Sequence, residues 1–260
     1  MSSYDILGNI AVIKGEGKTK EQKKKEAEEL LKKPGVETVL EKIGNVRGRL
    51  RTINARYVLG KRNKIALVKE NGCLFKLDVE SCYFSPRLSN ERQRIAEKIK
   101  ENERVLVMFA GVGVYPIVIY KYKKPKEIIG IEIGKECCRY FKENIRLNKV
   151  NPYAVKIIQG DVKKKISNKF LKEHGKFDVV IMARPNLKDS FLKQWLMASK
   201  KNTKIFYYGF CNDDEIDEIV DNLKKEANKL KRKIKIKNIV QAGEIAHYKH
   251  RFRIEIEVSN

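Results

Sequence analysis

The chain has 260 residues, of which 42% are hydrophobic, and it carries 57 Lys and Arg against 33 Asp and Glu, a formal net charge of +24. This length suits one large domain, or a large domain with a smaller partner. No run of about 18 apolar residues occurs, which excludes a membrane-spanning helix. The N-terminus MSSYDILGNI has no positive segment followed by an apolar one, so we expect no secretory signal.

The positive charge favours a polyanionic partner, held through phosphate contacts with release of counterions. A lysine-rich solvated surface is the other interpretation, and composition alone does not separate the two. The cysteines are odd in number and scattered, which fits neither a disulfide framework nor the paired spacing of a zinc site. We therefore expect a cytoplasmic protein without a bound metal. The cysteines are Cys73, Cys82, Cys137, Cys138 and Cys211.

Residues 1–88 predict a small α+β domain, with its boundary near 84–90. The expected elements are strands at 9–14, 56–60, 64–69 and 73–79 and one basic helix at 19–33. This region also contains an arginine cluster, NVRGRLRTINAR, at 45–56. Planar guanidinium groups suit phosphate and base recognition better than ammonium groups do, so Arg47 and Arg49 are expected to contact RNA.

Residues 89–260 alternate between helical and strand patterns. The expected order is a helix at 91–102, a strand at 104–109, a short helix after Gly113, a strand at 127–132, a helix at 136–148, a strand at 154–159, a basic helical segment, a strand at 177–182, a helix at 191–198 and a strand at 203–210. Short apolar strands that alternate with helices predict an α/β fold with a parallel sheet covered on both faces.

The end of the chain has a different pattern. A long charged helix is expected at 213–231, followed by adjacent strands at 233–240 and 250–258. In the last strand apolar residues alternate with charged ones, which predicts one solvated face. An antiparallel hairpin that closes an otherwise parallel sheet is the simplest arrangement.

The segment VLVMFAGVG, at 105–113, ends the first strand of that sheet. Gly111 and Gly113 let the backbone approach a ligand closely at a strand-to-helix turn. The segment is neither the GxGxxG of dinucleotide sites nor the Gly-Lys-Ser/Thr of a phosphate-binding loop. A nucleoside without phosphates is therefore the expected ligand.

Two acidic residues follow the next two strands. Glu132 ends the second strand, where a carboxylate can accept both ribose hydroxyls, and Asp161 follows the third, where an acid can reach an adenine amino group. This layout is the one expected for S-adenosyl-L-methionine. The alternative is a tight turn with two surface acids.

The block FSPRLSNERQRIA, at 84–96, followed closely by VLVMFAGVG, resembles the archaeal and eukaryotic tRNA (guanine-37, N1)-methyltransferases and their wyosine-pathway relatives. The resemblance runs from YDILGNIAVI through GRLRTINARYVLG and CLFKLDVESCYFSPRL to the C-terminal hairpin. It implies a Rossmann-like class I methyltransferase domain at 89–260 and a tRNA-interacting domain at 1–88. The longest members carry a further N-terminal domain, so the short archaeal form is expected here, as a monomer that embraces one tRNA.

The resemblance also implies a mechanism. Guanine N1 is a poor nucleophile until a base removes its proton, and a cation should stabilise the charge that develops on O6. In the family these roles fall to the glutamate of PRLxxER and to an upstream arginine, which match Glu91 and Arg51. The alternatives are a carboxylate that stabilises a helix N-terminus for Glu91 and a phosphate contact for Arg51.

The remaining expected contacts fall into two groups. Arg87 and Arg92 are expected to bind phosphate or brace the site. The expected cofactor contacts are Phe109, Ala110, Gly111, Gly113, Glu132, Asp161 and Arg87. The expected RNA contacts are Arg47, Arg49, Arg92, Arg184 and Asn186.

The chain departs from the family pattern at two places. Val107 stands where members usually have an acid, and IMARPNLKDSF has Ala183, Arg184 and Pro185 where the N1-methyltransferases typically show Asn-Leu-Pro. Pro185 is thus kept at a position beside the transferred methyl group and the target base, whereas the asparagine is not. A side chain that would contact the base edge is therefore changed.

The departures leave four functions open. The first is N1 methylation of guanine 37, and the second is methylation of a wyosine-type tricyclic base at that position, alone or alongside the first. Aminocarboxypropyl transfer from the same cofactor ranks behind them, because enzymes of that branch differ around the PRL segment. A tRNA-binding protein that has lost catalysis is the fourth, suggested by Val107 and Ala183.

Overall fold

The computed structural model describes residues 4–183, 189–246 and 249–260, without the side chains of 45–47 and 246. Its largest element is a seven-stranded sheet in the order β12-β13-β11-β10-β7-β8-β9. The strands are β7 (Arg104–Met108), β8 (Glu127–Glu132), β9 (Val155–Gln159), β10 (Phe177–Met182), β11 (Ser199–Cys211), β12 (Ile234–Ala246) and β13 (Lys249–Val258). The first five are parallel to one another, and β13 pairs antiparallel with both β11 and β12. The predicted parallel sheet with an antiparallel hairpin at its edge is confirmed.

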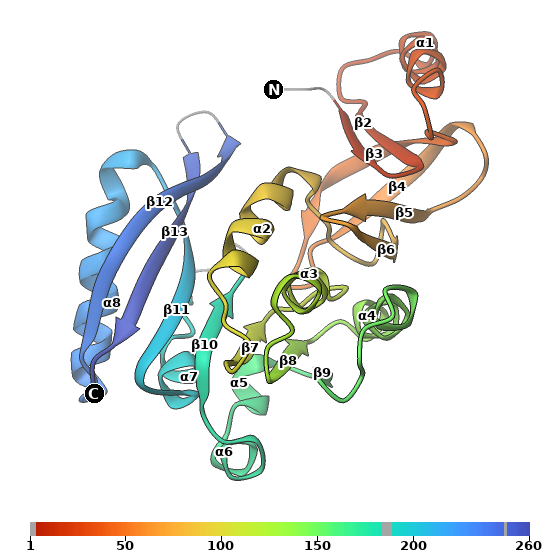
Figure 1. The fold of residues 1–260 in the computed structure, drawn as a ribbon. Coiled ribbons are helices and arrows are strands. Elements are labelled where there is room, and N and C mark those ends of the chain that lie inside the picture. Colours follow the sequence, from red (N-terminus) through yellow and green to blue (C-terminus); the bar gives the residue numbers. More distant parts are fainter. Residues whose placement is uncertain (1–3, 184–188, 247–248) are drawn as a thin grey trace.

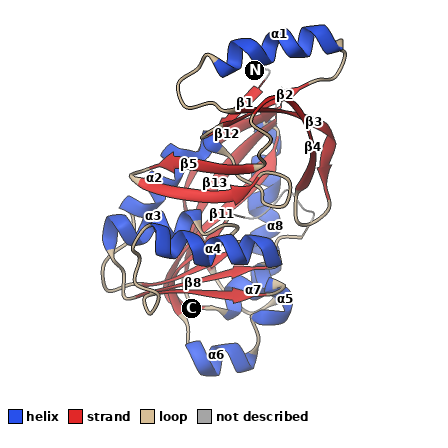
Figure 2. Ribbon diagram, turned by 90° about the vertical axis from the view of Figure 1, so that its right-hand side faces the viewer, coloured by secondary structure: helices blue, strands red, loops and turns tan. Residues whose placement is uncertain are grey.

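Helices cover both faces of this sheet (Figures 1 and 2). One face carries α2 (Ser89–Glu97), α3 (Val114–Lys123) and α4 (Lys135–Leu147), and the other carries α5 (Val162–Lys165), α6 (Asn168–His174), α7 (Leu192–Met197) and α8 (Ile216–Lys229). Successive side chains of β7 alternate between the two cores, since Val107 packs in the first and Leu106 in the second. The expected α/β fold class is thus confirmed. None of the described helices is long and apolar enough to cross a membrane.

Two helices differ from their predicted bounds by more than two residues. The helix expected at 91–102 ends at Glu97, because Lys98 and Ile99 donate to carbonyls three residues back and the side chain of Glu103 accepts the amide of Lys100. The helix expected at 213–231 begins with a 3₁₀ turn, Asp213–Glu215, before α8. Charge pattern alone does not reveal where such turns tighten.

The N-terminal part of the chain folds around its own sheet and core. The strands β1 (Tyr4–Leu7), β2 (Ile10–Lys14), β3 (Thr38–Arg47) and β4 (Thr52–Gly60) lie in that order, and α1 (Lys20–Leu31) connects the parallel pair β2 and β3. Leu30 of α1 packs with Ile13 and Val39 in a separate apolar cluster. The sequence did not predict β1, which is only four residues long, or β3, whose pattern is interrupted by Gly44 and Asn45.

A hairpin of β5 (Ile65–Glu70) and β6 (Cys73–Asp78) lies against α4. Asn144 of α4 accepts the amide of Lys76 and donates to its carbonyl, at 2.8 and 3.1 Å, and Asn148 does the same for Leu74 at 2.8 and 2.7 Å. Four residues of helix and two residues of strand both span about 6 Å, so the two amides match the edge of β6. The division of the chain at residue 88 stays a prediction.

Candidate active site

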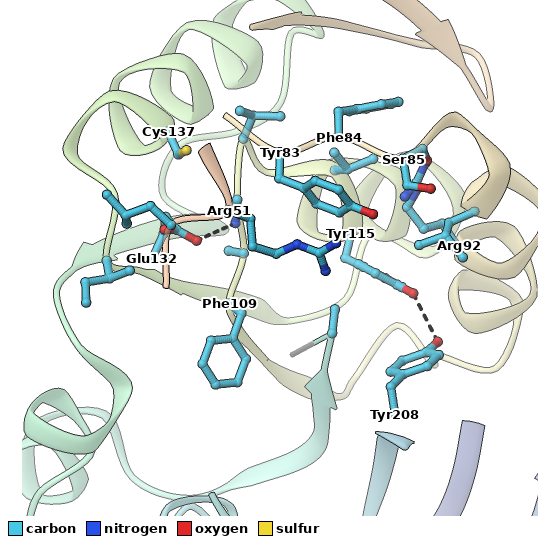
Figure 3. Close-up of a pocket in the computed structure, with 18 of the residues that line it drawn as sticks. Arg51, Tyr83, Phe84, Ser85, Arg92, Phe109, Tyr115, Glu132, Cys137 and Tyr208 are labelled. Atoms are coloured by element: carbon cyan, nitrogen blue, oxygen red, sulfur yellow. Dashed lines mark hydrogen bonds between the residues drawn. The ribbon is translucent and has the colours of Figure 1, made fainter. Parts of the chain in front are cut away.

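A pocket opens at the carboxyl ends of β7, β8 and β10, where the strand order reverses (Figure 3). Ligands of open α/β sheets bind at such switch points. Phe109 and Ala110 follow β7, Glu132 ends β8, and Ala183 follows β10. Residues from the N-terminal part of the chain and from the C-terminal hairpin complete the wall.

The loop after β7 owes its shape to its two glycines. Gly111 and Gly113 have φ angles of 56° and 88°, and Gly113 caps the N-terminus of α3. A Cβ atom on Gly113 would lie 2.1 Å from a ring carbon of Phe141, whereas one on Gly111 would meet no atom within 4 Å. Gly113 therefore allows close packing of loop and helix, and Gly111 keeps the backbone open on the pocket wall.

Glu132 holds this loop from the end of β8. Its Oε2 accepts the amide of Gly111 at 2.8 Å, and its Oε1 accepts the amide of Gly134 at 2.7 Å. Burial raises the pKa of Glu132 above its ordinary value, and the hydrogen bonds from Gly134 and Gly111 offset part of that effect. Each carboxylate oxygen keeps a further lone pair, so the side chain fits the hydroxyl groups of a ribose.

Asp161 lies in a smaller cavity beside the main pocket. Phe109, Ile133 and Arg49 line both cavities. The Oδ1 atom of Asp161 accepts the amide of Lys163 at 2.9 Å and so caps α5, and its Oδ2 accepts from Nη2 of Arg49 at 2.9 Å. Burial raises the pKa of Asp161, but the Lys163 and Arg49 bonds outweigh it and leave a lowered value. Arg49, which was expected to contact RNA, is thus paired with Asp161, the acid that was expected to bind the adenine amino group.

Arg51 reaches the same pocket from the loop between β3 and β4. Its backbone has a φ of 56°, and its guanidinium lies 3.8 Å from the ring centre of Tyr83. Figure 3 shows the side chain extending into the pocket. Stacking on the tyrosine restrains the guanidinium while its edges keep their hydrogen-bond donors.

Glu91 lies in the first turn of α2, behind the pocket wall. Its side chain is only 4% exposed, and Nη1 of Arg253 donates to both of its oxygens at 2.7 Å. The hydroxyl of Tyr208 donates to Oε1 at 2.6 Å, and the hydroxyl of Tyr115 donates to that of Tyr208 at 3.0 Å. The two tyrosines line the pocket and Glu91 does not, so the carboxylate is linked to the pocket wall through Tyr208.

Sequence reasoning missed these partners of Glu91. The face of β13 that carries Arg253 was expected to be solvated, and at this residue the prediction is wrong, since the side chain is 4% exposed. Helix α2 supplies the buried carboxylate that compensates its charge. Burial lowers the pKa of Arg253, but the hydrogen bond and charge of Glu91, together with the charges of Tyr208 and Glu255, leave it above its ordinary value. An arginine flanked by Phe252 and Ile254 was the available signal.

The other predicted arginines have different surroundings. Arg92 is buried in an ion pair with Glu70 and donates to the carbonyl of Ser85 at 2.8 Å. Arg87 is not part of the pocket wall, and it pairs with Asp5 at 2.8 Å. Arg251, which sequence reasoning missed, does line the pocket.

Of the two departures from the family pattern, the structure describes the first fully and the second only at Ala183. Val107 is fully buried in the apolar core of the sheet, and Ala183 lines the pocket. Arg184, Pro185 and Asn186 lie outside the described residues, as does the side chain of Arg47.

Within 4–183, 189–246 and 249–260, no group of three or more His, Cys, Asp or Glu side chains could hold a metal ion. The five cysteines are free and buried. A monomeric state and a cytoplasmic location stay predictions.

Fold and pocket together are those of a Rossmann-like methyltransferase, and comparison with known proteins defines the family. The model of the TRM5/TYW2 methyltransferase domain matches residues 66–237, and that of the TYW2 N-terminal domain matches residues 1–63. The chain belongs to the TRM5/TYW2 methyltransferase family. The resemblance seen in the sequence is confirmed, and so is the enzyme class, a tRNA methyltransferase.

Three relatives illustrate the range of the family. The tRNA (guanine(37)-N(1))-methyltransferase Trm5b of Pyrococcus abyssi is 32% identical over 237 residues, which are 90% of this chain and 68% of the relative. Its crystal structure superposes with a TM-score of 0.87 at 30% identity, over 100% of this chain and 76% of that one. The tRNA (guanine(37)-N(1))/4-demethylwyosine(37)-methyltransferase Taw22 of Nanoarchaeum equitans is 31% identical over 98% of this chain and 99% of the relative. TYW2 of M. jannaschii, solved in complex with AdoMet, shares the fold at 24% identity, with a TM-score of 0.75 over 98% and 99% of the two chains.

Proposed function

We propose that this tRNA methyltransferase methylates N1 of guanine 37, with S-adenosyl-L-methionine as its cofactor. The observation that carries the proposal is one pocket with two unlike sides. Glu132 lies on one side of the pocket and Tyr208 on the other, and the side chain of Arg51 extends between them (Figure 3). Glu132 accepts the amide of Gly111 on the first side, and Tyr208 contacts Glu91 on the second. The first side suits the cofactor, and the second suits a base that must lose a proton.

The nucleoside side fits S-adenosyl-L-methionine without a phosphate group. The carboxylate of Glu132 would accept the ribose hydroxyls, and the open backbone at Gly111 would allow the ligand to approach closely. Asp161, in the adjoining cavity, would hold the adenine amino group, and Phe109 and Ile133 line both cavities. When bound, the cofactor supplies a methyl group on a positively charged sulfur.

The other side acts on the target base. Glu91 receives the N1 proton, so that the nitrogen lone pair becomes nucleophilic. The guanidinium of Arg51, stacked on Tyr83, donates to O6 and stabilises the charge that develops there. Arg92, held by Glu70, braces the turn at Ser85 on the pocket wall.

The tRNA is the partner that the charge of the chain suits. A net charge of +24 favours a polyphosphate, and Arg49 and Arg51 stand on the loop that joins the N-terminal part to the pocket. The family relatives are named for position 37 of tRNA. That position lies beside the anticodon, so the same loop would contact the flanking nucleotides.

Methylation of 4-demethylwyosine at the same position is the second candidate. It is favoured by the match to Taw22 over nearly the whole length of both chains and by the match of residues 1–63 to the TYW2 N-terminal domain. Ala183 adds a small side chain to the pocket wall, which leaves room for a tricyclic base. The two activities are compatible in one enzyme.

The deciding experiment supplies methyl-labelled cofactor with two tRNAs, one with an unmodified G37 and one with 4-demethylwyosine at that position. Nucleoside analysis of the first should yield labelled 1-methylguanosine. Label in the tricyclic nucleoside alone would replace the first candidate by the second, and label in both would establish a bifunctional enzyme. Tight cofactor binding without transfer to either tRNA would contradict both.

A further inference from the structure

The residue expected to act as base does not reach the pocket by itself. Glu91 is buried against Tyr208 of β11 and Arg253 of β13, and of the residues that bond to its carboxylate Tyr208 is the one that lines the pocket. The contact is short, 2.6 Å from Oη to Oε1. A base that enters the pocket therefore meets the tyrosine first.

The Glu91 carboxylate is held by Arg253 on one side and by Tyr208 on the side of the pocket. Arg253 of β13 donates to both oxygens at 2.7 Å and is itself shared with Glu255 at 2.9 Å. Tyr208 of β11 is the partner on the pocket side, and Tyr115 of α3 donates to it. Arg92, on α2 like Glu91, is engaged with Glu70.

We propose that Tyr208 is a catalytic residue of this enzyme, whose hydroxyl takes the N1 proton of the target base and passes its own proton to Oε1 of Glu91. This inference rests on the proposed function, since it describes how the same site removes that proton. Tyr115 orients the relay, because its hydroxyl donates to the Tyr208 oxygen.

The relay balances without a further reactant. The N1–H bond of the base breaks, and its proton bonds to Oη of Tyr208 while the original Tyr208 proton bonds to Oε1 of Glu91. The N1 electron pair forms the bond to the methyl carbon, and the carbon–sulfur bond breaks with its electrons left on sulfur. Tyr208 ends neutral, and Glu91 ends as a neutral carboxylic acid beside Arg253.

The burial of the tyrosines suits this role. Burial, followed by the charge of Tyr115 and then that of Glu91, raises the pKa of Tyr208 well above its ordinary value. Burial likewise raises the pKa of Tyr115 to about 12. Both hydroxyls therefore keep their protons at neutral pH, and Tyr208 has one to give to the carboxylate at the moment it accepts another.

The test compares Tyr208→Phe with the wild type in single turnovers, with saturating cofactor and tRNA. The phenylalanine keeps the ring and removes the hydroxyl, so the rate should fall by about 10² or more while the dissociation constants for cofactor and tRNA stay unchanged. Tyr207→Phe is the matched control, because its ring faces the opposite core of the same strand, and it should react at the wild-type rate. Tyr115→Phe should lose about fivefold, the value of one net hydrogen bond.

A second measurement separates the relay from a structural role. The single-turnover rate of the wild type is followed in mixtures of H2O and D2O, where two protons in motion give a curved dependence on deuterium fraction. A linear dependence, or a Tyr208→Phe enzyme as fast as the wild type, overturns the relay, as does Tyr115→Phe being the slower variant. If the wild type methylates only the tricyclic base, the proposed function fails. The rates of Tyr208→Phe, Tyr115→Phe and wild type are then compared for that product, and they test the relay in the same way.

Discussion

The two sides of the pocket are built in different ways. On the cofactor side, Gly111 and Glu132 lie 21 residues apart and are joined by a backbone amide. On the base side, Glu91 is joined to Tyr208 and Arg253 across 117 and 162 residues by side chains alone. The cofactor side thus follows from the order of neighbouring strands, whereas the base side exists only once the C-terminal hairpin has docked against α2.

The largest effect should come from Glu91→Gln, which tests the base side. The amide cannot accept the N1 proton, so methyl transfer should fall by about 10³-fold or more, with cofactor affinity unchanged. Single-turnover kinetics measure the rate of methyl transfer, and calorimetric titration measures the affinity for the cofactor. The control is Glu97→Gln, on the exposed end of the same helix, which should react normally. An unchanged rate in Glu91→Gln would refute its role as base.

Arg253→Met should have the next largest effect, on stability. It leaves the Glu91 carboxylate buried without its charged partner, which costs about 3 kcal/mol or more. The free energy of unfolding in urea measures the loss. Arg253→Lys keeps a positive charge but loses the paired contact, so it should retain part of that stability. Equal stability of Arg253→Met and wild type would show that the pair does not hold the hairpin to α2.

This contrast also explains what the sequence could predict. The glycine loop, Glu132 and the alternation of strands and helices followed from local patterns, because each depends on residues close in the chain. The pairing of Arg253 with Glu91 did not, because a charged residue in an alternating strand is normally solvated, and only the packing of α2 over that face makes it buried. Nor did the contact of Arg49 with Asp161, which joins loops 112 residues apart.

Glu132→Gln tests the cofactor side and should have an intermediate effect. The amide group places a donor against the backbone donors of Gly111 and Gly134, so the loop loses a charged acceptor. The affinity for S-adenosyl-L-methionine should weaken by about 10- to 100-fold, measured by calorimetry, and tRNA affinity should not change. Glu136→Gln, in the exposed first turn of α4, serves as control. A tRNA affinity that fell equally would mean that the two sides are not independent.

Arg49→Ala should have the smallest effect, although it removes a contact between the two sides. The guanidinium is half exposed, and exposed ion pairs contribute about 0–1 kcal/mol, so cofactor affinity should change by less than about fivefold. The pH dependence of the stability that this ion pair contributes follows from Asp161, whose pKa lies below its ordinary value of 3.8. A carboxylate with a lowered pKa contributes stability above its ordinary value and loses it as the pH falls through the folded one. The difference in unfolding free energy between wild type and Arg49→Ala should therefore be present at pH 6 and be lost as the pH falls through the lowered pKa of Asp161 in the folded protein. A difference that grew in acid would mean that Arg49 acts through a group other than Asp161.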